Sequence, residues 1–242
     1  MSVYVIASVS LFVTIFVSGS IPLLYRWKQH HFDIFLCFGA GVLLSAAFLH
    51  MLPTAIESSG EQTGLFVLGG FLLLFFAEQF TMTHACSEEA CPNHKVGLSA
   101  LLGLSIHSII TGIALGVSFL GVSLLDGASH SVVYAMLFAV LIHKIPESLT
   151  LAAMLLASAW KRRTSFIAIL VFALMSPLGI WLSRYYSGNA LGAALGVSTG
   201  TFLYIASSDL LPHLHKKEAH RWWNLTAFTV GLLLLAFQRH SH

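Results

Sequence analysis

Two histidines and a glutamate stand out because their side chains bind metal ions and because they lie in strongly apolar segments. His107 and Thr111 are four residues apart in "LSIHSIITGIALG", and His143 and Glu147 are four residues apart in "LIHKIPESLT". Residues at this spacing share one face of an α-helix. Imidazole and carboxylate groups suit Zn²⁺ and its neighbours in the first transition row. The two stretches therefore predict a metal site between two helices.

Lys144 and Pro146 lie between the two candidate ligands of the second stretch. At about 100° per residue, Lys144 points about 100° away from His143, and Glu147 points about 40° away, between the two. One carboxylate can therefore face an imidazole and an ammonium at once. Pro146 has no N–H and frees a carbonyl near Ile142, which suits a helix beside a polar cavity.

The same side chains also have a purely structural explanation. His107 and His143 would then hydrogen-bond across helices, while Lys144 and Glu147 would form a buried salt bridge. Each ionisable group costs about 2.5–3.5 kcal/mol at the centre of a membrane helix, so each needs a partner or a function. The structural explanation is favoured for any single residue, whereas a metal site is favoured for the set.

The elements that must position these residues are membrane-spanning helices. The chain has 242 residues, of which 57% are hydrophobic and 9% charged, and its mean hydropathy is +0.83. A soluble domain carries charge on about 25% of its residues. The net charge of +2 and the lack of a basic block argue against nucleic acid as a partner. Segment 1–27 has no basic residues before its apolar run and no clear A-x-A site, which predicts a retained first helix.

Hydropathy predicts an all-α polytopic membrane protein with eight transmembrane helices, since about 20 apolar residues cross the bilayer core. The connecting segments are too short to hold a soluble domain, so residues 1–242 are expected to form a single membrane domain. The predicted spans are 3–25, 33–54, 63–83, 97–121, 131–158, 164–186, 189–212 and 221–238.

Basic residues predict the orientation of the eight helices. Arg184 and Arg239 fall on one side. The other side holds nine, namely Arg26, Lys28, Lys95, Lys161, Arg162, Arg163, Lys216, Lys217 and Arg221. Because Lys and Arg concentrate in cytoplasmic loops, both termini are expected to be extracytoplasmic and the loop at 84–95 cytoplasmic.

On these residues the chain resembles the ZIP (Zrt-, Irt-like protein) family of divalent-metal transporters. The resemblance covers the whole length and includes eight helices, a His-containing loop after the third helix, "HSxxxG" at 107–112 and "HKxPES" at 143–148. It implies inward movement of Zn²⁺, or in some members Fe²⁺ or Mn²⁺, across a plasma or bacterial inner membrane. It also implies a homodimer, and a transporter that is not an enzyme and needs no cofactor besides its cargo.

Carried over residue by residue, the resemblance places His107, His143 and Glu147 in the central metal site. Ser108 stands where many members have Asn, in the same site. Thr111 stands where many have Asp or Glu.

The resemblance also bears on a second, adjacent metal. Lys144 stands where members with two metals have Asp or Asn, and Ser176 stands where such members can have Glu. Together with Ser108, three positions for a second metal are weakened or inverted. We therefore expect one central metal, with the Lys144 ammonium as a tethered cation in place of the second.

Two further groups of residues have two readings each. His50 and Glu57 are seven residues apart and resemble the family's entrance positions, or they are an interfacial histidine and a solvated carboxylate. The loop at 84–95 is a flexible metal chelator or simply solvated; its candidate ligands are His84, Cys86, Cys91 and His94. Because the loop is expected in the cytoplasm, its cysteines are expected as thiols.

Three functions compete on this sequence. The first is a secondary transporter for Zn²⁺, with Fe²⁺, Mn²⁺, Co²⁺ or Cd²⁺ as other cargoes. The second is an intramembrane metal-dependent enzyme, although the H-E-x-x-H helix signature is absent from the chain. The third is a receptor, a metal-sensing protein or a structural membrane protein; in a receptor or structural protein the buried polar groups would only set helix packing.

Overall fold

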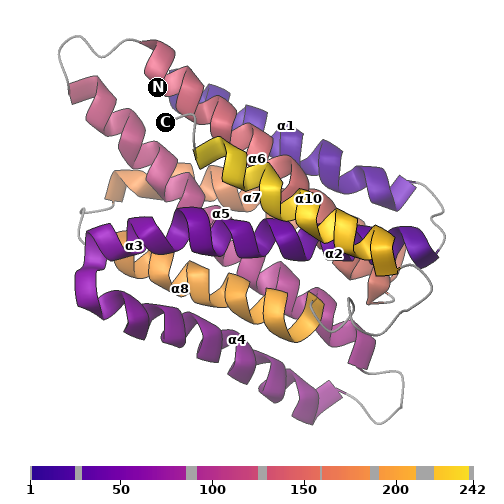
Figure 1. The fold of residues 1–242 in the computed structure, drawn as a ribbon. Coiled ribbons are helices and arrows are strands. Elements are labelled where there is room, and N and C mark those ends of the chain that lie inside the picture. Colours follow the sequence, from indigo (N-terminus) through magenta and orange to yellow (C-terminus); the bar gives the residue numbers. More distant parts are fainter. Residues whose placement is uncertain are drawn as a thin grey trace.

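The computed structural model of the chain consists of helices and the short turns between them. The long helices form one bundle in which many axes run in roughly the same direction (Figure 1). They are α1 (Ser2–Leu24), α2 (Gln29–Ser45), α4 (Thr63–Ala85), α5 (Pro92–Leu124), α6 (His130–Ala157), α7 (Arg162–Leu182), α8 (Leu191–Tyr204) and α10 (Arg221–Arg239). Shorter elements are η1 (Ala46–Met51), α3 (Leu52–Ser59), η2 (Gly60–Gln62), η3 (Ser183–Tyr185) and η5 (Ile205–Leu210). The structure describes residues 2–24, 29–85, 92–124, 130–158, 160–185, 191–210 and 221–239.

Six helical stretches of the described chain are long and apolar enough to cross a membrane. They are Val3–Leu24, Asp33–Gln79, Gly97–Phe119, Leu137–Ala157, Arg162–Tyr185 and Leu191–Ser208. The all-α, many-helix architecture is thereby confirmed. The count of eight spans is not confirmed, and the difference has two sources.

The first source is the stretch Asp33–Gln79, which contains two of the predicted spans in a single run of 47 residues. A straight helix of that length would be about 70 Å long, at 1.5 Å per residue. The chain instead folds back near Gly60, and α4 returns beside α8 (Figure 1). Gly60 has φ 54° and ψ −133°, a conformation open to glycine, and the Thr63 hydroxyl lies 2.8 Å from its carbonyl oxygen.

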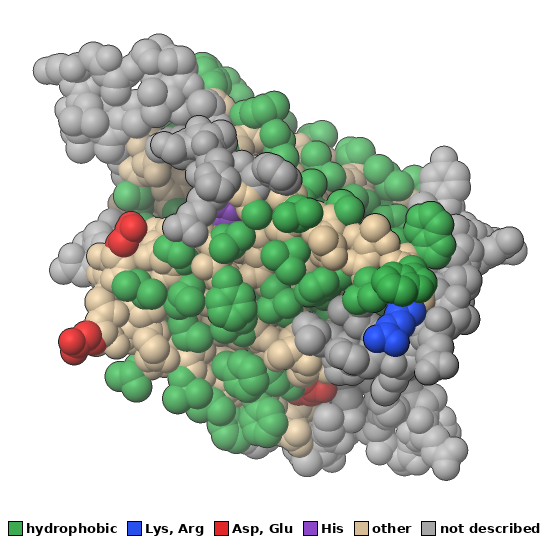
Figure 2. All heavy atoms as spheres, viewed as in Figure 1, with side chains coloured by type: hydrophobic (Ala, Val, Ile, Leu, Met, Phe, Trp, Pro, Cys, Tyr) green, Lys and Arg blue, Asp and Glu red, His purple; other side chains and the backbone are tan. Residues whose placement is uncertain are grey.

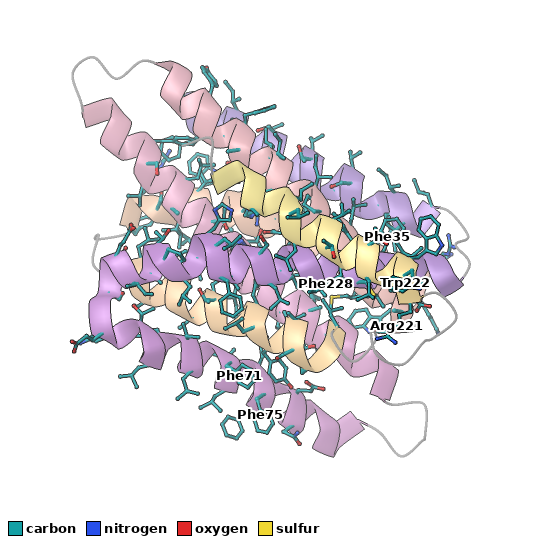
Figure 3. All side chains as sticks on the ribbon, in the orientation of Figure 1. Phe35, Phe71, Phe75, Arg221, Trp222 and Phe228 are labelled. Carbon is teal, nitrogen blue, oxygen red and sulfur yellow. The ribbon has the colours of Figure 1, made fainter. Side chains whose placement is uncertain are left out.

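The second source is α10, which is 19 residues long but polar at both ends. Its first turn carries Arg221, Trp222 and Asn224, which lower the mean hydropathy of the segment. Arg221 and Trp222 lie together at one end of the bundle (Figure 3), and the Trp222 side chain is 81% exposed. Tryptophan favours the interface between lipid and water. The span at 221–238 stays a prediction.

The two ends of the bundle are marked by arginines. Arg162 at the start of α7 donates a hydrogen bond to the Leu23 carbonyl at the end of α1. Arg184 in η3 lies 5.1 Å from the centroid of the Tyr4 ring, at the start of α1. On the face in Figure 2, hydrophobic side chains cover the middle, one Lys or Arg patch lies at one end, and Asp or Glu patches lie at the other end and near the lower edge. This distribution fits a protein that crosses a bilayer.

The predicted orientation can be tested with single cysteines at the two ends, in a variant whose native cysteines are replaced by serine. Glu61 and Arg163 are both exposed. Glu61→Cys should react with a membrane-impermeant maleimide in intact cells, because the positive-inside bias places its loop outside. Arg163→Cys should react only after permeabilisation. The reverse labelling pattern would show that the orientation is inverted.

Three helix pairs pack with their backbones in close contact. A Cβ at Gly112 of α5 would lie 2.2 Å from the Ser176 carbonyl oxygen of α7. The same holds for α4 with α8 and for α2 with α10; the atom pairs are Gly70 with Val197 O, Gly200 with Val67 O, and Gly41 with Phe228 O, at 2.0–2.1 Å. Small residues permit this approach in lipid, where apolar burial does not drive helices together.

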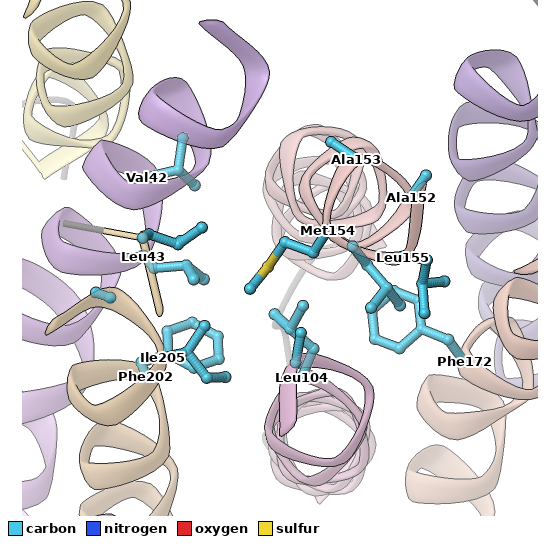
Figure 4. Packing of buried hydrophobic residues seen from close by; sticks show 14 of the residues in the cluster. Val42, Leu43, Leu104, Ala152, Ala153, Met154, Leu155, Phe172, Phe202 and Ile205 are labelled. Atoms are coloured by element: carbon cyan, nitrogen blue, oxygen red, sulfur yellow. The ribbon is translucent and has the colours of Figure 1, made fainter. Parts of the chain in front are cut away.

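A buried apolar cluster lies directly beside the candidate metal ligands. Leu104 of α5, Met154 of α6, Leu43 of α2 and Phe202 of α8 meet there (Figure 4). Leu104 is one turn from His107, on the side of the bundle where α5 begins. The helices that carry the ligands are therefore fixed by close packing within one turn of the site.

Two prolines lie near the site, and they affect their helices differently. Pro53 follows η1, a π-helical stretch that contains His50. Because Pro53 has no N–H, the carbonyl four residues earlier lacks its usual partner, which favours the wider π-helical turn. Helix α6, in contrast, runs without interruption through Pro146.

Candidate metal site

Three ligand atoms from α5 and α6 meet at one point inside the bundle. Glu147 Oε1 lies 3.0 Å from His107 Nε2 and 2.6 Å from His143 Nε2. The two Nε2 atoms are 3.5 Å apart. All three ligand atoms lie within 4.8 Å of one another, as a site for a single metal ion requires. The structure thus brings together the three residues that the sequence predicted as its central ligands.

Glu147 Oε1 is buried and, within the described part of the chain, accepts no hydrogen bond of normal geometry. Both Nε2 atoms lie within 3.0 Å of this oxygen, but neither contact counts as a hydrogen bond in the structure. A buried carboxylate oxygen without a donor is costly. A cation held between Oε1 and the two Nε2 atoms would satisfy it, so the donor set fits a first-row divalent ion.

The other carboxylate oxygen of Glu147 contacts Lys144. Lys144 Nζ lies 2.6 Å from Oε2, and its side chain is completely buried. The carboxylate therefore divides its two oxygens between the imidazoles and the ammonium, as the helical angles predicted. This charge pair is nearly neutral as a unit, which lowers the cost of placing it inside a membrane protein.

Contacts from three residues orient the His107 imidazole. Ser198 Oγ of α8 lies 2.9 Å from Nδ1, and the Phe202 ring centroid is 4.4 Å from the imidazole centroid. Thr111 Oγ1 lies 3.1 Å from Nε2 and 2.9 Å from the His107 carbonyl oxygen. The sequence placed Thr111 on the same face as His107, but it gave no indication of Ser198 or Phe202.

Ser108 points away from the three ligand atoms and toward α7. Its Oγ lies 2.7 Å from Ser176 Oγ, and the Ser176 hydroxyl also lies 3.2 Å from the Ser108 carbonyl oxygen. Both side chains are completely buried. Two of the positions that the resemblance assigned to a second metal therefore hydrogen-bond to each other.

A comparison with known proteins decides the family. The model of the family described as "ZIP Zinc transporter" matches residues 1–99 and 83–238, which together span nearly the whole chain. The chain belongs to the ZIP zinc transporter family. Members of this family are multi-pass membrane proteins, in agreement with the six apolar helices of the structure.

Two curated relatives match over almost their full length, and a third matches over a shorter region. Zinc transporter ZIP9 of Xenopus tropicalis is 24% identical over 94% of this chain and 92% of its own. Zinc transporter ZIP2 of Homo sapiens is 25% identical over 90% and 91%. Zinc transporter ZIP1 of Danio rerio is 33% identical over a shorter region, 46% of this chain and 36% of its own. All three are named as transporters and not as enzymes.

Of the two residues predicted at the entrance of this ZIP protein, His50 is the one that the structure relates to His143. His50 in η1 is half-buried and within electrostatic range of His143, while Glu57 in α3 is exposed. The His143 side chain is 24% exposed, against 4% for His107 and 2% for Glu147. Among the three ligands, His143 is therefore the most exposed.

The loop at 84–95, with its predicted ligands Cys86 and Cys91, falls largely outside the described residues, and the side chains of His84 and His94 do as well. Its two readings stay open. Cys37 is described; it is a free, buried thiol in α2.

Proposed function

We propose that this ZIP protein is a secondary transporter that moves a divalent metal ion into the cytoplasm through one central site. Its ligands are His107, His143 and Glu147, and Zn²⁺ is the preferred cargo, with Fe²⁺, Mn²⁺, Co²⁺ and Cd²⁺ as other candidates. The observation that carries the proposal is the convergence of two imidazole nitrogens and one orphaned carboxylate oxygen inside a membrane-spanning bundle. Imidazole ligands with one carboxylate match the known preferences of zinc.

A single ion is favoured over a pair. The Lys144 ammonium occupies Glu147 Oε2, the oxygen that a second ion would need. Ser108 and Ser176 supply hydroxyl groups that bond to each other, in place of an amide and a carboxylate. In this proposal Ser108 joins α5 to α7 beside the site, and Lys144 acts as a tethered cation.

The ion reaches the site from the His143 side. His50 and Glu57 offer an imidazole and a carboxylate along that approach, where a hydrated ion exchanges part of its water for protein ligands. On the other side of the site, Leu104 and Met154 are completely buried and block the passage of the ion. Delivery to the other side therefore requires the helices around this apolar cluster to rearrange.

The rest of the chain completes the proposal. In this proposal residues 1–242 form a single transport domain whose expected assembly is a homodimer. The loop at 84–95 keeps its two readings, a flexible metal chelator or a solvated loop. The predicted orientation, with both termini outside, makes the direction of transport inward.

The function is tested by Zn²⁺ uptake into liposomes that hold the purified full-length protein and a trapped zinc-sensitive dye. Wild-type protein should import Zn²⁺, because it can hold the ion between two imidazoles and a carboxylate within the bilayer. His143→Ala should fall to the level of protein-free liposomes. Tyr134→Phe, on an exposed position of the same helix, should import like wild type.

Two results would contradict the proposal. Uptake by His143→Ala at the wild-type rate would place the path of the ion elsewhere. No uptake by folded wild-type protein would favour the metal-sensing or enzymatic alternatives over transport.

A further inference from the structure

Ser198 is the one described residue of α8 whose hydroxyl reaches a candidate metal ligand. Its Oγ lies 2.9 Å from His107 Nδ1, and its side chain is completely buried. Hydroxyl groups inside a helix commonly hydrogen-bond to a carbonyl three or four residues earlier. Its neighbours do so, since Thr199 bonds to the Leu195 carbonyl and Thr201 to the Ser198 carbonyl. The Ser198 hydroxyl instead contacts the imidazole.

The position of this hydroxyl is fixed by the packing of α8 against α4. A Cβ at Gly200 would lie 2.0 Å from the Val67 carbonyl oxygen, and a Cβ at Gly70 would lie 2.0 Å from the Val197 carbonyl oxygen. Ser198 lies between these two backbone contacts, so its Cα has little freedom to move. One turn further along α8, Phe202 covers the same imidazole.

The bond matters because His107 presents Nε2 to the candidate metal position. An imidazole that binds a metal through Nε2 carries its proton on Nδ1. A hydrogen-bond acceptor at Nδ1 favours that tautomer, fixes the ring orientation and makes the ligand more basic. A serine hydroxyl can accept a hydrogen bond from Nδ1–H. It can also rotate and donate a hydrogen bond to Nδ1 when the ion has left.

We propose that Ser198 is a positioning residue of the metal site: its hydroxyl oxygen accepts a hydrogen bond from His107 Nδ1–H, so that Nε2 is free to bind the ion. The inference rests on the proposed transport function and extends it to a helix that supplies none of the three ligands. The contact also joins α5, which packs on α7, to α8, which packs on α4. The affinity of the site therefore depends on where α8 stands relative to α5.

The test measures Zn²⁺ binding by calorimetry on full-length protein in detergent, together with the apparent KM and maximal rate of uptake in liposomes. Ser198→Ala should weaken Zn²⁺ binding by about 10- to 100-fold, the usual effect of removing a group that orients a metal ligand. Its KM should rise by a similar factor. Ser198→Thr keeps the hydroxyl and should stay within about threefold of wild type, a small fraction of that loss.

The matched control is Thr199→Val, which removes a buried hydroxyl that bonds only within α8 in the described structure. It should bind Zn²⁺ like wild type. Thermal unfolding without zinc should be similar for Ser198→Ala and Thr199→Val, which separates a loss of affinity from a loss of folding.

The outcomes distinguish this inference from the function on which it rests. If His107→Ala loses binding while Ser198→Ala binds like wild type, Ser198 has no positioning role. Equal losses in Ser198→Ala and Ser198→Thr would show that the hydroxyl is not what matters. If His107→Ala itself binds Zn²⁺ like wild type, the proposed metal site is wrong.

Discussion

Glu147→Gln should lose zinc uptake and much of its folding stability at the same time. The amide removes the negative charge of the carboxylate that both imidazoles face. It also leaves the Lys144 ammonium without the counter-charge that it contacts at 2.6 Å, in a completely buried position. Removing one partner of a buried ion pair costs about 3–5 kcal/mol, because the remaining charge is uncompensated.

The two losses can be separated with a second substitution. Lys144→Met combined with Glu147→Gln removes both charges and keeps the volume of the buried side chains. Replacing a buried ion pair with apolar groups of similar size is often neutral or stabilising. The double variant should therefore unfold near the wild-type temperature in detergent and still import no zinc.

Thermal unfolding followed by tryptophan fluorescence, together with liposome uptake, measures the two effects. A Glu147→Gln protein as stable as wild type would show that Lys144 does not depend on this carboxylate. Zinc uptake by the double variant would remove Glu147 from the metal site.

The central cluster could be predicted from sequence because each helix fixes its own geometry. His143 and Glu147 are one turn apart on α6, and Lys144 lies where its ammonium meets the same carboxylate, as the angles along the helix require. The position of His107 relative to α6 depends on how the helices pack, so the sequence does not fix it directly. We expected His107 to lie near the other ligands because an unpaired polar group inside a membrane is costly. The structure confirms the Lys144–Glu147 contact and the convergence of the three ligand atoms.

The role of α8 could not be predicted in the same way. Ser198 is 91 residues from His107 in the sequence. The segment "VSTGT" offers three hydroxyl-bearing residues, and all three are buried. Which of them faces α5 is decided by how α8 packs against α4 through Gly70 and Gly200. The glycine spacing of α8 marks a face for close helix packing, but it does not tell which helix packs there.

The number of spans shows a related limit. Hydropathy measures composition along the chain, so Asp33–Gln79 counts as one apolar run although the backbone turns at Gly60. The gap between the predicted spans 33–54 and 63–83 already contained that break. At α10 the composition is ambiguous, because its tryptophans suit an interface as well as a span. Composition therefore identifies the membrane protein more securely than it counts its helices.

Lys144→Met should bind zinc more tightly than wild type and release it more slowly. The ammonium contacts Oε2 of the same carboxylate whose Oε1 faces the two imidazoles. An ion at that position would be about 6 Å from Nζ, and at an effective dielectric near 20 the repulsion for a divalent ion is about 5 kcal/mol. Even a third of that figure is about a tenfold change in affinity.

The same substitution should weaken the zinc-free protein. Without the ammonium, the buried carboxylate has no counter-charge until an ion arrives, so unfolding should occur at a lower temperature without zinc. Added Zn²⁺ should then stabilise Lys144→Met more than it stabilises wild type, because stabilisation grows with affinity. In liposomes, KM and the maximal rate should both fall. Lys161→Met removes an exposed lysine at the start of α7 and is the matched control.

Lys144→Asp should create a second metal position, because it replaces the tethered cation with a potential ligand. A carboxylate at this position, beside Glu147 Oε2, would offer a second ion the contact that Nζ now occupies. Calorimetry should then give two Zn²⁺ per chain in place of one, and anomalous scattering should show two neighbouring ions. One ion in Lys144→Asp, together with unchanged affinity in Lys144→Met, would mean that Lys144 only neutralises Glu147 and does not stand in for a second metal.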